Sequence, residues 1–105
     1  MKVYACYEEN NHAYLIECGA ITDFTIYDTP EKALLWFAER VSEGVKNGHI
    51  IDSDDPNYIN NNVCDMKQIS NDLKDDNFVS LTMFNGYQEN WDESYAICID
   101  VKEVK

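Results

Sequence analysis

Apolar residues recur at every second position, or in short unbroken runs, in five stretches of the chain, a pattern typical of strands. The first three stretches are residues 3–7, 13–18 and 21–27. The segments between them are too short for the crossover that joins parallel strands. We therefore predict that these three strands form an antiparallel meander.

Two further strands are predicted near the end of the sequence, at 78–84 and 94–102. The first is followed by Asn85-Gly86, a dipeptide that favours a tight turn between paired strands. The second has a regular period of two, which places alternate side chains on one face. These side chains are Tyr95, Ile97, Ile99 and Val101. We expect the two strands to pair with each other.

Between the two groups of strands the apolar period changes from two to about 3.6, which predicts a long helix at 30–47. Its apolar stripe consists of Leu34, Phe37, Ala38, Val41 and Val45. Thr29 is suited to cap the first turn, and Gly48 is suited to end the helix. Trp36 and Arg40, four residues apart, lie off the centre of this stripe.

The segment 48–62 is rich in Asp and Asn, which favour turns over strand ladders, so we predict a long loop there. A shorter helix is predicted at 63–74, with Asn62 as its cap. The predicted order of elements is β-β-β-α-α-β-β within one domain that spans residues 1–105. We expect an α+β fold in which an antiparallel sheet of about five strands is packed on one face by the long helix.

The composition adds an unusual charge to this fold. The chain of 105 residues carries 20 Asp and Glu against 8 Lys and Arg, a formal net charge of −12. Because 45% of its residues are hydrophobic, the chain has enough apolar surface to fold, and the surplus charge must lie outside. Lys and Arg are missing from residues 3–31, 47–66 and 75–101, so the surplus belongs mainly to the predicted strands and loops.

An anionic surface argues against direct binding to nucleic acid or to acidic membranes, since both need Lys and Arg. The sequence has no apolar run long enough to span a membrane, and its start does not resemble a signal peptide, which predicts a cytoplasmic protein. We expect the cysteines to be free thiols, because they are far apart and mostly fall within apolar runs. They are Cys6, Cys18, Cys64 and Cys98.

No motif in the sequence predicts a catalytic, metal or cofactor site. Asp52-x-Asp54-Asp55 is similar to the start of a calcium-binding loop, but Pro56 stands where an oxygen ligand is needed. Val63 stands where such a loop requires its final Glu. No pair of Cys or His has the spacing of zinc ligands. We therefore predict a non-enzymatic protein without metal or cofactor.

The charge itself is the best indication of a partner. Duplex DNA has one charge per ~1.7 Å of axis, so a net charge of −12 equals that of ~20 Å of duplex. If this charge is gathered on one face, that face would be complementary to a Lys/Arg-rich groove on a protein that handles nucleic acid. Anti-CRISPR and anti-restriction inhibitors that imitate DNA bind their targets in this way. Trp91 is a candidate anchor for such contacts. The residues expected to bind the partner are Asp52, Asp54, Asp55, Glu89, Trp91, Asp92 and Glu93.

Two other hypotheses remain open. The chain is also suited to be an immunity protein or antitoxin that binds one cognate toxin, with its resemblance to DNA incidental. Alternatively its acidity serves solubility alone, since a negative surface keeps proteins apart. Under this last hypothesis Trp91 covers the sheet and the acids beside it are only hydrated.

Overall fold

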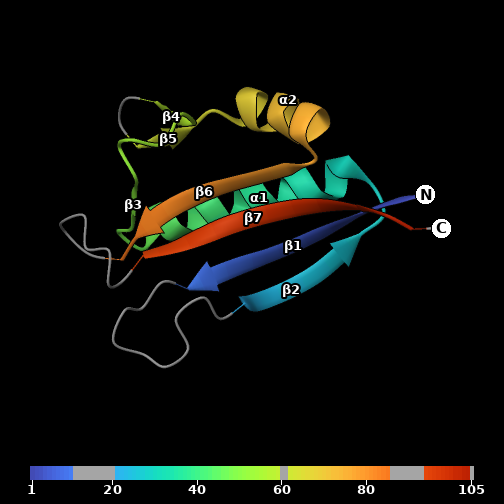
Figure 1. The fold of residues 1–105 in the computed structure, drawn as a ribbon. Helices are drawn as coiled ribbons and strands as arrows, with labels where there is room; N and C mark the ends of the chain where they lie inside the picture. Colours follow the sequence, from blue (N-terminus) through green and yellow to red (C-terminus); the bar gives the residue numbers. More distant parts are fainter. Residues whose placement is uncertain (11–20, 60–61, 86–93, 105) are drawn as a thin grey trace.

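An antiparallel sheet and two helices make up the structure, a computed structural model that describes residues 1–10, 21–59, 62–85 and 94–104. Five strands form the sheet in the order β2-β1-β7-β6-β3, and β4 pairs with β5 in a separate ladder (Figure 1). This confirms the predicted α+β fold. In chain order the elements are β1 (Lys2–Asn10), β2 (Ile21–Tyr27), α1 (Pro30–Lys46), β3 (Ile50–Ile51), β4 (Tyr58–Ile59), β5 (Val63–Cys64), α2 (Met66–Asp76), β6 (Phe78–Phe84) and β7 (Ser94–Glu103).

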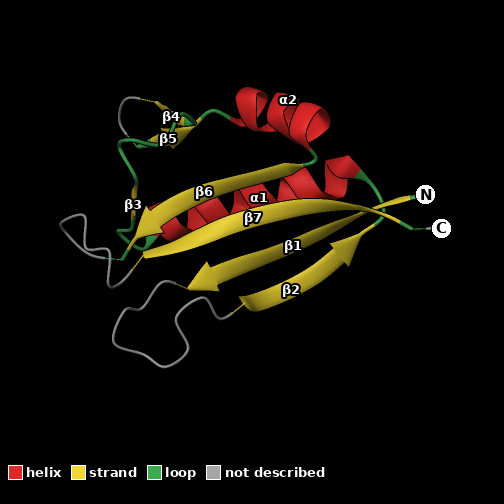
Figure 2. Ribbon diagram, viewed as in Figure 1, coloured by secondary structure: helices red, strands yellow, loops and turns green. Residues whose placement is uncertain are grey.

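The helices and one face of the sheet enclose the core (Figure 2). Side chains of α1, α2 and the inner strands belong to one buried cluster, which includes Phe37, Ile69, Leu81 and Ile97. The molecule is a flat body of 42 × 34 × 20 Å. The long helix packs on one face of the sheet, as predicted. Within the described ranges, no helix combines the length and the apolar character that a membrane crossing needs.

Strands β6 and β7 show the predicted period of two and pair as expected. Leu81 lies opposite Ile97, and Val79 lies opposite Ile99. On its other side β7 pairs with β1, where Cys6 lies opposite Ile99. These five side chains are buried. They point to the helical face because side chains in neighbouring strands that are directly opposite share a face.

The long helix begins and ends close to the predicted positions. The Thr29 hydroxyl accepts a hydrogen bond from Lys32 N at 3.3 Å, which satisfies one of the free amides of the first turn. Pro30 occupies the first helical position, where it loses no helical hydrogen bond. After Asn47 caps the last turn, Gly48 adopts φ +89°, a conformation that favours glycine. Residues at the two ends of the helix therefore determine where it begins and ends.

The predicted apolar stripe of α1 is rotated relative to its buried face. Trp36, expected off the centre of the stripe, is buried at 8% exposure, whereas Val45 is 36% exposed. The buried face is made of Ala33, Trp36, Phe37, Val41 and Gly44. The error arose because hydrophobicity alone ranked Val45 above Gly44, although a Cβ atom at Gly44 would lie only 2.8 Å from the Tyr95 hydroxyl on the sheet.

The predicted meander of the first three strands is wrong. β1 pairs directly with β2, with Tyr4 opposite Tyr27 and Glu9 opposite Ile21. No strand lies between them, and the segment 13–18 falls outside the described residues. Short connections favour pairing between strands that are neighbours in the sequence. Here the first predicted strand, 3–7, instead pairs with the third, 21–27. A register shift between Cys6 and Glu8 interrupts this ladder.

The segment 48–62, predicted to be a loop, contains two short strands among its described residues. They were not predicted because the many Asp and Asn residues around them favour turns. Ile50–Ile51 pairs with β6 and supplies the fifth strand of the sheet. Asn62, which adopts φ 62°, is not part of the sheet, but its side chain forms hydrogen bonds with the backbone of this strand and of the residue before it. Its amide donates to His49 O at 3.2 Å, and its Oδ1 accepts from Ile51 N at 2.6 Å. A side chain thus satisfies backbone groups that an edge strand would leave unpaired.

The second helix starts three residues later than predicted. It spans Met66–Asp76, and its cap is Asp65 rather than Asn62. The Asp65 carboxylate accepts a hydrogen bond from Gln68 N at 3.1 Å. Val63–Cys64 instead pairs with Tyr58–Ile59. Both Asn62 and Asp65 are suitable caps by residue type, and only the strand pairing between them decides which one acts.

Candidate functional site

The register of the sheet defines two ends of the molecule. Asn10, Phe84 and Ser94 lie at one end, and Lys2, Phe78 and Glu103 lie at the other. We call the first the loop end. It comprises the described residues of 8–10, 21–24, 40–65, 82–85 and 94–97. We call the second the terminal end. It comprises residues 1–4, 26–33, 73–80 and 98–104.

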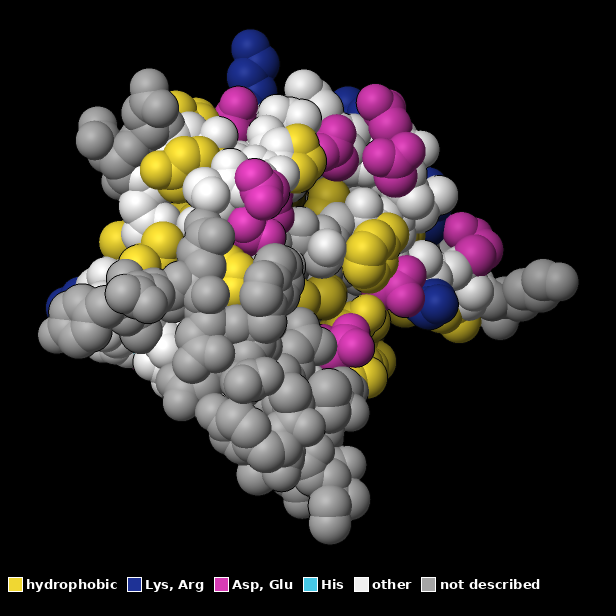
Figure 3. Space-filling view, turned by 60° about the vertical axis from the view of Figure 1, so that its left-hand side comes forward, with side chains coloured by type: hydrophobic (Ala, Val, Ile, Leu, Met, Phe, Trp, Pro, Cys, Tyr) yellow, Lys and Arg dark blue, Asp and Glu magenta, His cyan; other side chains and the backbone are white. Residues whose placement is uncertain are grey.

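The loop end is more acidic than the terminal end. Among its described residues the acids are Glu8, Glu9, Asp23, Glu43, Asp52, Asp54, Asp55 and Asp65, and the bases are Arg40 and Lys46. The terminal end has the acids Asp28, Glu31, Asp75, Asp76, Asp100 and Glu103, and the bases Lys2, Lys32, Lys74 and Lys102. In Figure 3 the acidic side chains form separate groups, with Lys and Arg around the margin of the view. The surplus is thus concentrated at one end without forming a continuous band on that face.

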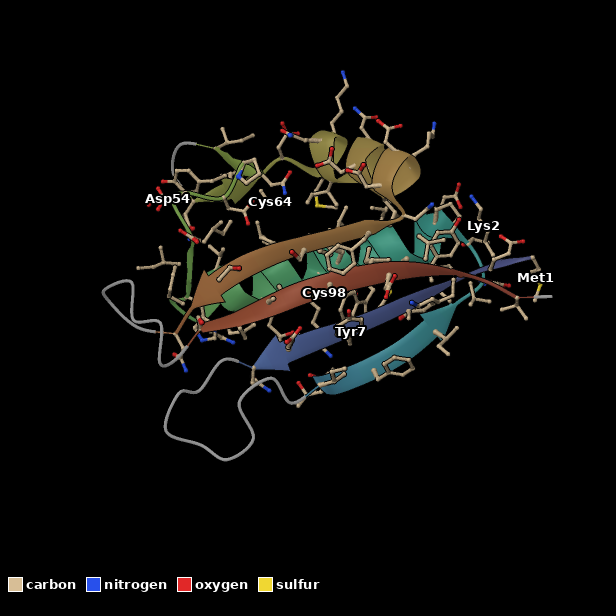
Figure 4. All side chains as sticks on the ribbon, in the orientation of Figure 1. Met1, Lys2, Tyr7, Asp54, Cys64 and Cys98 are labelled. Carbon is tan, nitrogen blue, oxygen red and sulfur yellow. The ribbon has the colours of Figure 1, made fainter. Side chains whose placement is uncertain are left out.

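The three predicted contact residues of the loop after β3 differ in their surroundings. Asp52 is only 8% exposed, and its carboxylate accepts from Asp54 N at 3.0 Å. The Asp55 carboxylate accepts from Asn57 N at 2.8 Å and from Thr82 N at 3.4 Å. These two acids therefore shape the loop and hold it against β6. Asp54 is exposed and lies at the outer edge of the loop end in Figure 4.

The other predicted contact residues lie outside the described part of the chain. They are Glu89, Trp91, Asp92 and Glu93, which belong to the connection between β6 and β7. The described residues on either side of this connection are Asn85 and Ser94. Both of these described residues belong to the loop end.

Arg40 is the centre of a charged group that the sequence did not reveal. Its guanidinium nitrogens lie 3.7 Å from Glu8 Oε2 and 3.6 Å from Asp23 Oδ1. Its guanidinium carbon lies 5.8 Å from the centre of the Trp36 ring, within cation–π range. Burial raises the pKa of Glu8, and the positive charge of Arg40 offsets only part of that effect. The Glu8 carboxylate is therefore incompletely compensated.

A polar cavity of about 270 Å³ lies beside this group, between the second half of α1 and the ends of β1 and β7. Within it, His49 Nδ1 lies 2.6 Å from the Tyr95 hydroxyl. Burial is the main cause that raises the pKa of Tyr95 to about 12, so this hydroxyl stays protonated at neutral pH. The side chains that line the cavity are Glu8, Asn10, Arg40, Glu43, Asn47, His49, Asn85 and Tyr95.

The cavity was missed because its residues are scattered along the sequence. The one available signal was the spacing of Trp36, Arg40 and Gly44, which lie four residues apart on one side of α1. A charged residue at that spacing within a buried stripe must have a partner nearby, because a buried charge is costly when it is unpaired. That partner, Glu8, lies on another element 32 residues earlier in the sequence, so the periodicity of the helix does not identify it.

The described cysteines are thiols of low reactivity. Cys6, Cys64 and Cys98 are free, as expected, and the first and last are buried. Burial raises the pKa of Cys6 and Cys98 to about 12 and that of Cys64 to about 11. Since the thiolate is the nucleophile, these groups are poor nucleophiles at neutral pH. In the described part of the chain, no group of three His, Cys, Asp or Glu is placed to hold a metal ion.

Comparisons with protein-family models, with curated proteins and with solved structures found no match to this chain. The site must therefore be interpreted from its own geometry and charge.

Proposed function

We propose that this chain is a non-enzymatic interaction protein whose loop end binds a Lys/Arg-rich surface on another protein. The observation that supports the proposal is the unequal division of charge. The loop end has eight described acids against Arg40 and Lys46, whereas the lysines gather at the terminal end. The negative electrostatic potential of this end speeds the encounter with a basic surface and orients the chain as it approaches.

The proposed partner is a protein that handles nucleic acid, because such proteins present grooves of Lys and Arg. A duplex as long as the 34 Å middle dimension of the molecule carries ~20 charges. The eight acids and two bases described at the loop end give it a net charge about a third as large as that of this length of duplex. This density suits a partner that contacts a few phosphates at a time. The same charge repels nucleic acid itself, so the proposal includes no direct binding to it.

Among the predicted contact residues that the structure describes, the exposed one is Asp54, and the proposal assigns it a direct contact. Glu89, Asp92 and Glu93 are proposed to add charge to the surface that binds the partner, and Trp91 to supply an aromatic anchor. The free thiols of Cys6, Cys64 and Cys98 are consistent with the proposed cytoplasmic location, where thiols stay reduced.

Neutralising acids at the loop end is expected to weaken binding of a ten-residue lysine peptide about tenfold, because three exposed ion pairs of up to about 1 kcal/mol each are lost. The variant combines Glu9→Gln, Glu43→Gln and Asp54→Asn, none of which takes part in the ion pairs of Arg40. Titration calorimetry at two ionic strengths measures the dissociation constant and its salt dependence.

The matched control has the same number of neutralised acids at the terminal end. It combines Glu31→Gln, Asp75→Asn and Asp76→Asn, all of which are exposed. We expect a change of less than about twofold, since charges farther than a Debye length of ~10 Å are screened at 0.1 M salt. Equal weakening in both variants would mean that only net charge matters, and would favour the hypothesis that acidity serves solubility.

A further inference from the structure

A second cavity, of about 350 Å³, lies at the terminal end, away from the acidic surface. The start of α1, the end of α2 and the strands β1 and β7 surround it. Its apolar lining is formed by Tyr4, Leu34, Leu73 and Val101, which also pack against the core. Asn77 O accepts a hydrogen bond from Val101 N at 2.8 Å, which ties the end of α2 to β7 at the cavity wall. The cavity is therefore bounded by connected, regular elements.

Two lysines line this cavity and have no carboxylate partner. Neither Lys2 nor Lys74 forms an ion pair within the described part of the chain. By contrast, Lys32 lies 3.0 Å from Asp28, and Lys102 lies 3.2 Å from Asp100. Lys46 and Lys67 likewise form no ion pair in the described part of the chain, so the distinguishing feature of Lys2 and Lys74 is that both line one cavity.

The charge of the cavity lining is positive, in contrast to the protein as a whole. Among the described lining residues, Lys2 and Lys74 stand against one acid, Glu31. The two lysines come from β1 and α2, so two different elements bring a basic residue to the cavity wall. A carboxylate has two oxygens and accepts a hydrogen bond from each of two donors. Apolar walls with a few convergent polar groups are the usual composition of a small-molecule site.

We propose that this cavity binds a small organic carboxylate, with its apolar body against Tyr4, Leu34 and Leu73 and its carboxylate between Lys2 and Lys74. The volume equals that of about a dozen waters at ~30 Å³ each, which corresponds to a ligand of roughly ten non-hydrogen atoms. The site is separate from the loop end and does not depend on the function proposed for it.

Octanoate, which has a carboxylate and an apolar chain of suitable size, is the probe for this site. Titration of the isotope-labelled protein, followed by amide chemical shifts, is expected to give saturable shifts at Lys2, Ser70, Asn77 and Val101. A ligand of this size should bind with a dissociation constant of about 1 mM or tighter. Octanol, which lacks the charge, and octylamine, which reverses it, should bind at least about tenfold more weakly, because they form no ion pair with the lysines.

Two variants test the two halves of the proposal. Lys2→Gln with Lys74→Gln should weaken octanoate binding about tenfold, while the equally charged control Lys46→Gln with Lys67→Gln, at lysines that do not line the cavity, should leave it unchanged. Ser70→Leu keeps both lysines and fills part of the cavity, so it should reduce binding although the charges remain. The amide spectrum of each variant reports whether its fold is intact.

Three results would overturn the proposal. The first is an absence of saturable shifts up to about 10 mM octanoate, a concentration well above the expected dissociation constant. The second is equal binding of octanoate and octanol, which would remove the role of the lysines. The third is equal loss in the two lysine variants, which would show a response to net charge alone. None of these results bears on whether the loop end binds a basic partner.

Discussion

Replacing Phe37 by alanine is expected to destabilise the fold by about 3–5 kcal/mol, the usual cost of emptying the site of a buried aromatic ring. Phe37 lies near the middle of α1 and is completely buried in the cluster shared by both helices and the sheet. A domain of this kind is typically stable by about 5–15 kcal/mol, so the loss removes a large part of the total. Urea unfolding followed by circular dichroism measures the change in the free energy of unfolding.

Leu35→Ala is the matched control on the same helix. Leu35 lies two residues before Phe37 but is 61% exposed, so its removal leaves no cavity. We expect a change within about 0.5 kcal/mol, the range of most surface substitutions. Similar losses in the two variants would contradict the assigned orientation of α1, because the buried face would then include Leu35.

Gly44→Ala is expected to destabilise the fold by about 1–2 kcal/mol, although alanine favours helices by about 1 kcal/mol over glycine. A Cβ atom at this position would lie 2.8 Å from the Tyr95 hydroxyl and 3.0 Å from the end of Met83. Methionine is flexible and moves aside easily, whereas the rigid Tyr95 ring does not. The cost of overpacking, about 1–3 kcal/mol, therefore outweighs the gain in helix propensity. Thermal and urea unfolding measure the net change.

The Tyr95→Phe background separates the two opposing effects of Gly44→Ala. Removing the hydroxyl removes the closest atom that the new methyl group would meet. It also removes the hydrogen bond to His49, so Tyr95→Phe alone should cost about 1 kcal/mol. In this background Gly44→Ala should be neutral or stabilising. A double-mutant cycle without coupling between the two positions would contradict the close contact of α1 with β7.

The sequence predicted best those elements whose signals are local. The bounds of α1 follow from Thr29, Pro30 and Gly48, each of which acts on its own neighbours. The alternation of β6 and β7 likewise follows from a period of two within each strand. Elements that depend on distant partners were not predicted. Ile50–Ile51 is a strand only because β6 lies beside it, and no local feature of an Asp- and Asn-rich segment shows this.

The candidate site was predicted less completely than the fold. Composition and the gaps between basic residues indicated an acidic surface, but not which acids share an end of the molecule. That grouping depends on how the strands pair and on how α1 packs on the sheet, which brings Glu8 of β1 close to Glu43 of α1 at the polar cavity. Sequence also does not distinguish an acid that binds a partner from one that shapes a loop. Asp52 and Asp54 are two residues apart, yet only Asp54 is exposed.

The most direct measurement of the central claim compares the local potential at the two ends of the molecule. Amide relaxation is recorded with a cationic and then with an anionic nitroxide of the same size, at 0.1 M salt, where screening over ~10 Å separates the ends. If the loop end is the anionic docking surface, the ratio of cationic to anionic enhancement at Asp54 should exceed the ratio at Asp75 and Asp76 by about twofold or more. Equal ratios at these positions would show that the surplus charge is spread evenly, and the proposed docking surface would then have no physical basis.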